Sequence, residues 1–428
     1  MNNICKFANR KLQIMKRARD FFKVLGPGLL YAGAAIGVSH LVQSTKAGAM
    51  FNFDLVWILI LANFLKYPFF EFAPRYAVST GRNLVQGYAS VGRWALLLFT
   101  GLTVLTMLPN MATVTVVTVG LISYVFQVSI NLTYLSLAVL VVAMLVLLIG
   151  RYSLLDKVVK FIMILLALST MMAVFAAFDI QKEVSPEALA SFSWRENADI
   201  IFLIAFVGWM PAPLDLSVWS SMWNLEKIKE LGYKPALKSV LTDFKIGYIG
   251  TAIMAFGFLS MGALVMYGTG EQFSPNGTLF SEQLIYLYTS SLGSWAFWVV
   301  SIAGVTTMLS TTITVLDAYP RVLSAIFKEF VGKMETSNAK LYRIMMVVMV
   351  VGAILTIAYA AKSMAFMVTM ATTLAFLSAP FLAWLNYRVV TDNHMPAEGR
   401  PGKFLRVLSI IGITFFAGFA LVYVGLRF

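Results

Sequence analysis

Long apolar stretches recur along the whole chain, and they constrain its fold more than any other feature. One of them, LAVLVVAMLVLLIG at residues 137–150, runs without a charged residue. About 20 consecutive apolar residues are enough for a helix to cross a bilayer. The strands of a membrane β-barrel would instead alternate apolar and polar residues. The sequence therefore predicts an all-α integral membrane protein.

The composition excludes a soluble enzyme and a disordered protein. Of the 428 residues, 59% are hydrophobic and 12% are charged, whereas soluble domains are about 45–50% apolar and about 25% charged. The net charge of +13 does not indicate a nucleic-acid partner, because basic residues gather in the cytoplasmic loops of membrane proteins. The single cysteine, Cys5, cannot form an internal disulfide. We expect the lipid bilayer as the main partner and no nucleic acid.

The distribution of basic residues supports eleven membrane spans. If the N-terminus is cytoplasmic, 27 of the 33 Lys and Arg residues fall on the inner side and 5 on the outer side, and Lys66 lies within a span. Such a bias sets the orientation of membrane proteins. We expect a cytoplasmic N-terminus and an external C-terminus in a cell inner (plasma) membrane. The predicted spans lie near residues 25–48, 54–78, 94–126, 131–150, 154–178, 199–222, 241–268, 284–317, 341–361, 364–389 and 404–426.

Two of these spans are predicted to be broken near their middle. The first holds small and polar residues around Gly37, and the sixth holds Pro211 and Pro213, which remove backbone donors and clash with the preceding turn. Broken backbone at membrane depth is tolerated where it is buried in protein or lines a cavity. Since the breaks lie five spans apart, they indicate two inverted repeats with a binding site between them. The alternative is that both are ordinary kinks.

These patterns divide the chain into five segments. The longest external piece, at 179–198, is a candidate for a surface helix. The segments are a basic cytoplasmic N-terminal segment at 1–24, a first five-span repeat at 25–178, the external loop at 179–198, a second repeat at 199–389, and a cytoplasmic loop with the eleventh span at 390–428.

Several collinear motifs resemble the Nramp divalent-metal transporters. GPGLLYAGAAIGVSHLVQSTKAGA at 26–49 resembles their first span, RYAVSTGRNLVQGY at 75–88 the exit of their second, WMPAPLDLSVWSS at 209–221 their sixth, and STTIT at 310–314 their eighth. The resemblance implies a fold of the leucine-transporter type, with two inverted five-helix repeats and an eleventh transmembrane helix. It also implies a divalent metal ion as the transported substrate, protons as a candidate coupling ion, and no resident cofactor.

The chain departs from this family at the residues that matter for metal binding. The positions of the family motif Asp-Pro-Gly-Asn are here Gly37, Val38, Ser39 and His40, so the carboxylate is missing. The sixth-span motif A-x-x-M-P-H becomes Val207-Gly-Trp-Met-Pro-Ala, which keeps the methionine. No charged residue lies between 94 and 126, where the family has an acidic relay. Metal specificity and proton coupling therefore stay open.

Three residues near the breaks are candidate metal ligands. His40 and Met210 offer borderline and soft ligands, and Asp215 could supply the missing negative charge, because acidic groups within spans are rare and mark ion paths. Their structural alternatives are a buried and hydrogen-bonded histidine, a packing methionine and an N-cap aspartate. The predicted substrate and metal site consists of Gly37, Ser39, His40, Val207, Met210 and Asp215.

Further charged residues are candidates for coupling or for a gate. Asp317 and Arg321 are spaced for an ion pair at i,i+4. Glu71 and Lys66 share the second span, where we expect each to be paired or to extend toward the interface. No nucleotide loop or hydrolase motif indicates an enzyme. We expect a secondary transporter that imports a Mn- or Fe-like divalent ion, by symport if protons couple. The alternatives are a transporter of another small solute and a non-transporting sensor.

Overall fold

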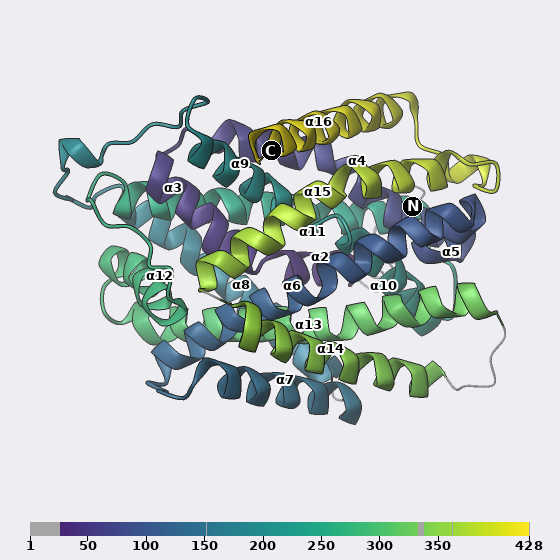
Figure 1. Cartoon of the computed structure of the whole chain (residues 1–428), viewed down its shortest axis with the longest axis horizontal. Coiled ribbons are helices and arrows are strands. Elements are labelled where there is room, and N and C mark those ends of the chain that lie inside the picture. The colour runs from purple at the N-terminus through teal and green to yellow at the C-terminus, as the bar shows by residue number, and fades with distance from the viewer. Residues whose placement is uncertain (1–25, 151, 333–337, 362, 428) are drawn as a thin grey trace, which may run out of the picture.

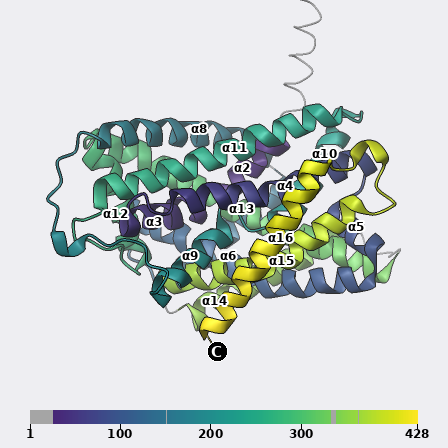
Figure 2. The ribbon, with the colours of Figure 1, turned by 90° about the horizontal axis from the view of Figure 1, so that it is seen from above.

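The computed structural model describes residues 26–150, 152–332, 338–361 and 363–427, and the regular elements in these ranges are all helices. The long helices lie side by side in one bundle (Figures 1 and 2). The elements of the first half are α2 (Pro27–Ala35), η1 (Ser39–Ser44), α3 (Thr45–Phe51), α4 (Val56–Thr80), α5 (Leu84–Val91), α6 (Arg93–Val125), α7 (Leu132–Ile149), α8 (Tyr152–Ala177) and η2 (Pro186–Ala188). The second half has α9 (Asn197–Trp209), α10 (Leu216–Leu231), α11 (Leu237–Met261), η3 (Gly262–Met266), α12 (Gly277–Leu292), α13 (Ala296–Val331), α14 (Asn338–Ala360), α15 (Met364–Thr391), η4 (Ala397–Gly399) and α16 (Lys403–Arg427).

Within the described ranges, eight helices are long and apolar enough to cross a membrane. They match eight of the predicted spans: the second, third, fourth, seventh, eighth, ninth, tenth and eleventh. The first and sixth spans are each divided into shorter helices, as the small residues and the two prolines predict.

The first break lies between α2 and η1. Helix α2 begins at Pro27, a position that proline favours because its missing N–H would have no helical partner. The helix stops where Ile36 leaves the helical region, with ψ of 87°. The chain resumes as the π-helix η1 and continues into α3.

The second break lies between α9 and α10. Helix α9 ends at Trp209, and Met210 is extended, with φ of −97° and ψ of 119°. Pro211 and Pro213 follow, neither of which can donate a backbone hydrogen bond. Helix α10 starts at Leu216, so the interruption covers residues 210–215.

The predicted start of the eighth span is wrong. Residues 284–292, which we assigned to that span, belong to the separate helix α12. The Asn276 side chain caps α12 at its start, and Gly293 ends it with φ of 92°. The apolar residues of α12 and α13 follow each other so closely that hydropathy alone merges them. In the 179–198 segment, which we expect to be external, the short 3-10 turn η2 takes the place of the candidate surface helix, and α9 begins at Asn197.

Close helix contacts hold the two broken helices in the core. A Cβ on Gly28 would lie 2.1 Å from the carbonyl oxygen of Asp243, and one on Gly247 would lie 2.0 Å from the carbonyl oxygen of Gly28. Helix α9 approaches α15 as closely, because a Cβ on Gly208 would lie 2.2 Å from the carbonyl oxygen of Thr372. Small residues allow such close packing in membrane proteins. The helices that precede the two interruptions are thus packed closely against the long helices α11 and α15.

Candidate functional site

A cavity in the core lies between the two interruptions. It is bounded by the end of α2, the start of η1, the residues around the second break, and side chains of α6 and α13. Trp209 and Trp219 contribute aromatic surface, and Asn110 and Thr311 contribute polar groups. None of the described residues that line it carries a charge.

The two interruptions also touch each other directly. The Ser39 hydroxyl lies 3.4 Å from the carbonyl oxygen of Pro211, 2.8 Å from that of Ala35 and 2.7 Å from Nδ1 of His40. Ser39 and Gly37, both predicted site residues, line the cavity. A Cβ on Gly37 would lie 3.0 Å from a methyl carbon of Thr311. A carboxylate at position 37 would therefore require Thr311 to move.

His40 is fully buried and both of its ring nitrogens have partners. Nε2 lies 2.9 Å from the carbonyl oxygen of Thr251 on α11, so it must carry the hydrogen that this acceptor needs. Nδ1 faces the Ser39 hydroxyl. In this conformation neither nitrogen is available to a metal ion, and the side chain links the first break to α11.

Val207 and Met210 lie at the second break. Met210 is fully buried and belongs to the continuous apolar core, so its surroundings are those of a packing residue. The carbonyl oxygen of Val207 accepts a hydrogen bond from the ammonium group of Lys66 at 2.7 Å.

Asp215 is buried at the start of α10, but its side chain does not cap that helix. Its Oδ2 accepts a hydrogen bond from the Tyr319 hydroxyl on α13 at 2.5 Å. That hydroxyl in turn accepts one from the Asn110 amide on α6 at 2.6 Å. Oδ1 of Asp215 is buried and makes no hydrogen bond with the described residues. One acceptor of a buried carboxylate is thus left open.

Lys66 differs from its sequence-based expectation. It neither pairs with Glu71 nor extends to the membrane interface. Its side chain is fully buried, and Nζ donates to the carbonyl oxygens of Val207, Gly208 and Ala212 at 2.7, 2.8 and 3.2 Å. An ammonium has three donors, so these carbonyls satisfy all of them.

The candidate gate residues form two separate ion pairs. Glu71 forms an ion pair with Arg75 and accepts a hydrogen bond from the Tyr67 hydroxyl, and all three residues lie on α4. The predicted pair of Asp317 and Arg321 is confirmed, with 2.7 Å between carboxylate and guanidinium. The Tyr342 hydroxyl also donates to Asp317, at 2.5 Å.

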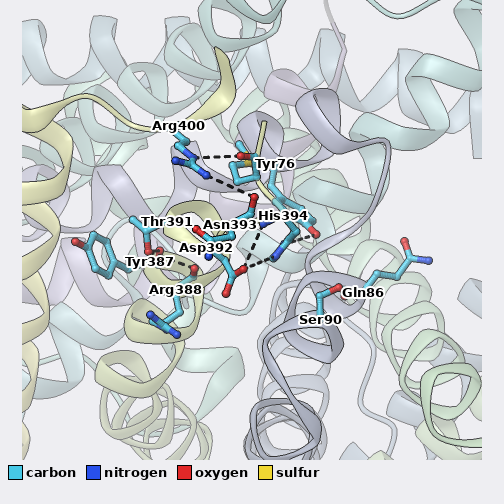
Figure 3. Close-up of polar contacts among 11 residues, drawn as sticks. Tyr76, Gln86, Ser90, Tyr387, Arg388, Thr391, Asp392, Asn393, His394 and Arg400 are labelled. Carbon is cyan, nitrogen blue, oxygen red and sulfur yellow. Dashed lines mark hydrogen bonds and ion pairs between the residues drawn. The ribbon is translucent and has the colours of Figure 1, made fainter. Parts of the chain in front are cut away.

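The second histidine, His394, lies outside the core. Figure 3 shows it between Asp392 and Tyr76, in the loop that follows α15. Its Nδ1 lies 3.0 Å from Oδ1 of Asp392, and its Nε2 lies 3.2 Å from the Tyr76 hydroxyl. His394 therefore takes no part in the central site.

A divalent metal ion fits the central residues poorly. Within the described ranges, no three His, Cys, Asp or Glu side chains gather into a metal-binding group. His40 is engaged elsewhere, position 37 has no carboxylate, and the Val207 carbonyl is bonded to a cation of the protein itself. Hard divalent ions need several oxygen ligands, including carboxylates. Only Asp215 and the Met210 sulfur remain of the predicted set.

The sequence matches the family described as natural resistance-associated macrophage protein-like over residues 28–425. The chain belongs to the Nramp family. It is therefore a multi-pass membrane protein of a transporter family, not an enzyme. A curated relative, an uncharacterized protein of Pasteurella multocida (strain Pm70), is 35% identical over 407 residues, which cover 94% of this chain and 92% of the relative.

Solved structures of a manganese transporter of Eremococcus coleocola share the fold. A mutant of that protein matches with a TM-score of 0.66 at 14% identity, covering 93% of this chain and 85% of the other. The same transporter in complex with an aromatic bis-isothiourea substituted compound matches with a TM-score of 0.64 at 13% identity, covering 94% and 86%. These likenesses support an all-helical Nramp fold of the leucine-transporter type.

Two residues that contact the second break, Lys66 and Tyr319, were not assigned to the predicted site. Lys66 had a visible signal, since a lysine in the middle of an apolar span is costly and tends to be functional. Tyr319 had none, because nothing in the local sequence distinguishes it from other tyrosines of apolar helices. Only the packing of α13 against the second break reveals its role.

Proposed function

We propose that the protein is a secondary active transporter that carries a small solute through the cavity between its two broken helices. One observation carries this proposal: two interrupted helices, far apart in sequence, meet through Ser39 and Pro211 beside an uncharged cavity. Discontinuous helices near the bilayer midplane are where secondary transporters bind their cargo.

We also propose the repeat organisation and the membrane orientation that the sequence predicts. Residues 25–178 and 199–389 form two inverted five-helix repeats, and α16 is the eleventh span. The repeats move against each other and expose the cavity first to one side and then to the other. The N-terminus is cytoplasmic and the C-terminus external in a cell inner membrane, as the distribution of basic residues favours.

The lining of the cavity favours a cargo other than a metal ion. Two tryptophans, one asparagine and small apolar residues suit a neutral or weakly polar solute. The alternative cargo is a Mn- or Fe-like divalent ion, imported with or without protons. Met210 favours this second candidate, because it keeps the methionine of the family motif at the break.

Alternating access can be tested before the cargo is known. In a Cys5→Ser background, Thr311→Cys places a thiol in the cavity, and Ser136→Cys places a control thiol in the buried part of α7. We expect a membrane-impermeant thiol reagent to label position 311 from outside in spheroplasts and from inside in inverted vesicles, while position 136 stays unlabelled. Labelling of position 311 from one side only would favour the sensor over the transporter.

The two cargo classes are separated by flux. Proteoliposomes loaded with a metal-sensitive dye are expected to show no Mn²⁺ or Cd²⁺ influx above that of empty liposomes. Metal influx that Met210→Ala reduces would support the divalent-metal candidate instead.

A further inference from the structure

We propose that Lys66 is a resident cation: a tethered ammonium that takes the place of a bound cation at the interruption between α9 and α10. The inference rests on the proposed function for the place where cargo passes, and it deepens that proposal by excluding a class of cargo. It starts from a contact that the sequence did not predict.

The backbone around the second break offers three acceptors to a cation. Helix α9 ends at Trp209, and the last carbonyl groups of a helix carry partial negative charge and lack their full set of intrahelical partners; the Val207 carbonyl accepts only a 3.3 Å hydrogen bond from the Met210 amide within the chain's own turn. Val207, Gly208 and Ala212 are buried, so their carbonyl groups need hydrogen-bond partners. The carbonyls of Val207, Gly208 and Ala212 all point to one position, and Nζ of Lys66 occupies it.

Charge and packing around the ammonium complete the arrangement. Asp215, in the same interruption, carries the opposite charge and attracts Lys66 electrostatically. A buried charge is tolerated when it is paired and hydrogen-bonded. The ring of Phe416 on α16 lies 5.9 Å from Nζ and covers another side. Helix α4 therefore supplies a cation to α9, to the interruption that follows it, and to α16.

A second lysine, Lys46, lines a separate cavity. Lys46 is the one charged side chain among the described residues that line a cavity between α3, α9, α12 and α15. Gln43, in the same lining, points inward to Thr372, with 3.5 Å between its amide nitrogen and the threonine hydroxyl. The carbonyl oxygen of Thr372 packs on Gly208, one of the residues that hold Lys66.

These contacts select against a divalent cation as cargo. Val207 is one of the positions where the family resemblance places the metal site, and its carbonyl is already bonded to an ammonium. A divalent ion could use that carbonyl only by displacing Lys66 within the core, where like charges repel strongly. The protein thus supplies the positive charge that a metal ion would bring.

Chemical rescue tests the proposal in the full-length protein, in detergent or nanodiscs. Lys66→Ala removes three carbons and the ammonium, and propylammonium has the same atoms. We expect Lys66→Ala to lower the thermal unfolding midpoint, and millimolar propylammonium to restore at least half of the loss. The neutral analogue 1-propanol should restore none. Asn63→Ala is the matched control, because Asn63 is buried one turn earlier on α4 and donates only within that helix. Its midpoint should not respond to propylammonium.

A milder variant keeps the test decisive if Lys66→Ala fails to fold. Lys66→Gln retains hydrogen-bond donors without the charge, and we expect its midpoint to fall below that of the wild type by more than that of Asn63→Ala. A Lys66→Gln midpoint equal to the wild type, or rescue of Lys66→Ala by 1-propanol as well as by propylammonium, would overturn the proposal. The proposal would also be overturned if calorimetry showed that the wild type binds Mn²⁺ with micromolar affinity and that Lys66→Gln binds it with the same affinity. These readouts do not depend on transport, so the proposed function can fail while the resident cation stands.

Discussion

The hydroxyl group of Tyr319 donates a hydrogen bond to Oδ2 of Asp215 at 2.5 Å, which ties the long helix α13 to the interruption between α9 and α10. Both residues are buried. Because the Asn110 amide donates to the same hydroxyl, both α6 and α13 are linked to the carboxylate of the interruption. This link explains how the Asp215 carboxyl group is held in place at the centre of the bundle.

Removing the Tyr319 hydroxyl should therefore destabilise the site. Tyr319→Phe leaves both Oδ2 of Asp215 and the Asn110 amide without this partner, and an unsatisfied buried group costs about 1–3 kcal/mol. We expect a lower thermal midpoint and slower modification of a thiol at position 311. Tyr288→Phe is the control. It deletes a buried hydroxyl that forms a 2.8 Å hydrogen bond with Thr170, and neither residue lines the cavity. Equal effects of the two variants on modification would contradict a specific role for Tyr319.

Asp243 should stabilise α2, the helix before the first break. Its Oδ2 accepts from the Gly28 amide at 2.7 Å and its Oδ1 from the Gly26 amide at 3.2 Å, so α11 caps the start of α2. Asp243→Ala removes both acceptors, and we expect a loss of about 1–3 kcal/mol in unfolding free energy. Asp54→Ala, which removes one exposed contact to the Phe192 amide, should change the midpoint little. A stability of Asp243→Ala close to that of Asp54→Ala would refute the cap.

The sequence predicted the helical fold and both interruptions, because apolar runs and helix-breaking residues are local signals. Pro211 and Pro213 can be identified without knowing their neighbours. It misplaced the start of the eighth span, since Gly293 is the only strong boundary between two apolar helices. Local patterns thus fix which segments are helical better than where neighbouring helices separate.

The contacts of the site were less accessible to sequence reasoning. His40, Met210 and Asp215 were grouped because they lie near the breaks, yet His40 turns to Thr251 of α11 and Asp215 to Tyr319 of α13. Which way a buried side chain turns depends on helices more than a hundred residues away. The same holds for Lys66, whose partners are 141–146 residues distant.

The proposed orientation predicts which loops a reagent can reach. In a Cys5→Ser background, Ser191→Cys lies at an exposed position of the 179–198 loop, and Ala397→Cys at an exposed position after α15. We expect an impermeant maleimide to label position 191 in intact cells and position 397 only after permeabilisation. The reverse pattern would invert the assigned topology, and labelling of both in intact cells would contradict the odd number of crossings between them.

The loop after α15 should show a simple pH dependence. Burial raises the pKa of Asp392, but the hydrogen bonds from the His394 ring and backbone amide lower it more, so the net pKa lies below its ordinary value. A depressed carboxyl pKa stabilises the fold above the ordinary pKa, and this contribution is lost as the pH falls through the native value. Asp392→Asn should therefore lower the midpoint slightly near neutral pH, and the difference should begin to shrink as the pH falls below about 4 and vanish below the native pKa. Glu398→Gln, exposed in the same loop, should show no such trend, and a difference for Asp392→Asn that grows with acid would contradict the assignment.

The contact between α9 and α15 should tolerate no side chain at position 208. A Cβ there would lie 2.2 Å from the backbone carbonyl oxygen of Thr372, which cannot rotate away. Gly208→Ala must push α9 from α15 and displace the carbonyl that Lys66 bonds, so we expect a loss of about 1–3 kcal/mol, as for other overpacked cores. Gly250→Ala on α11 is the matched control, because no atom lies within 4 Å of its added Cβ and alanine favours a helix by up to about 1 kcal/mol. Thermal midpoints of the two variants in nanodiscs should move in opposite directions. A Gly208→Ala protein as stable as the wild type would mean that α9 and α15 are not in close contact.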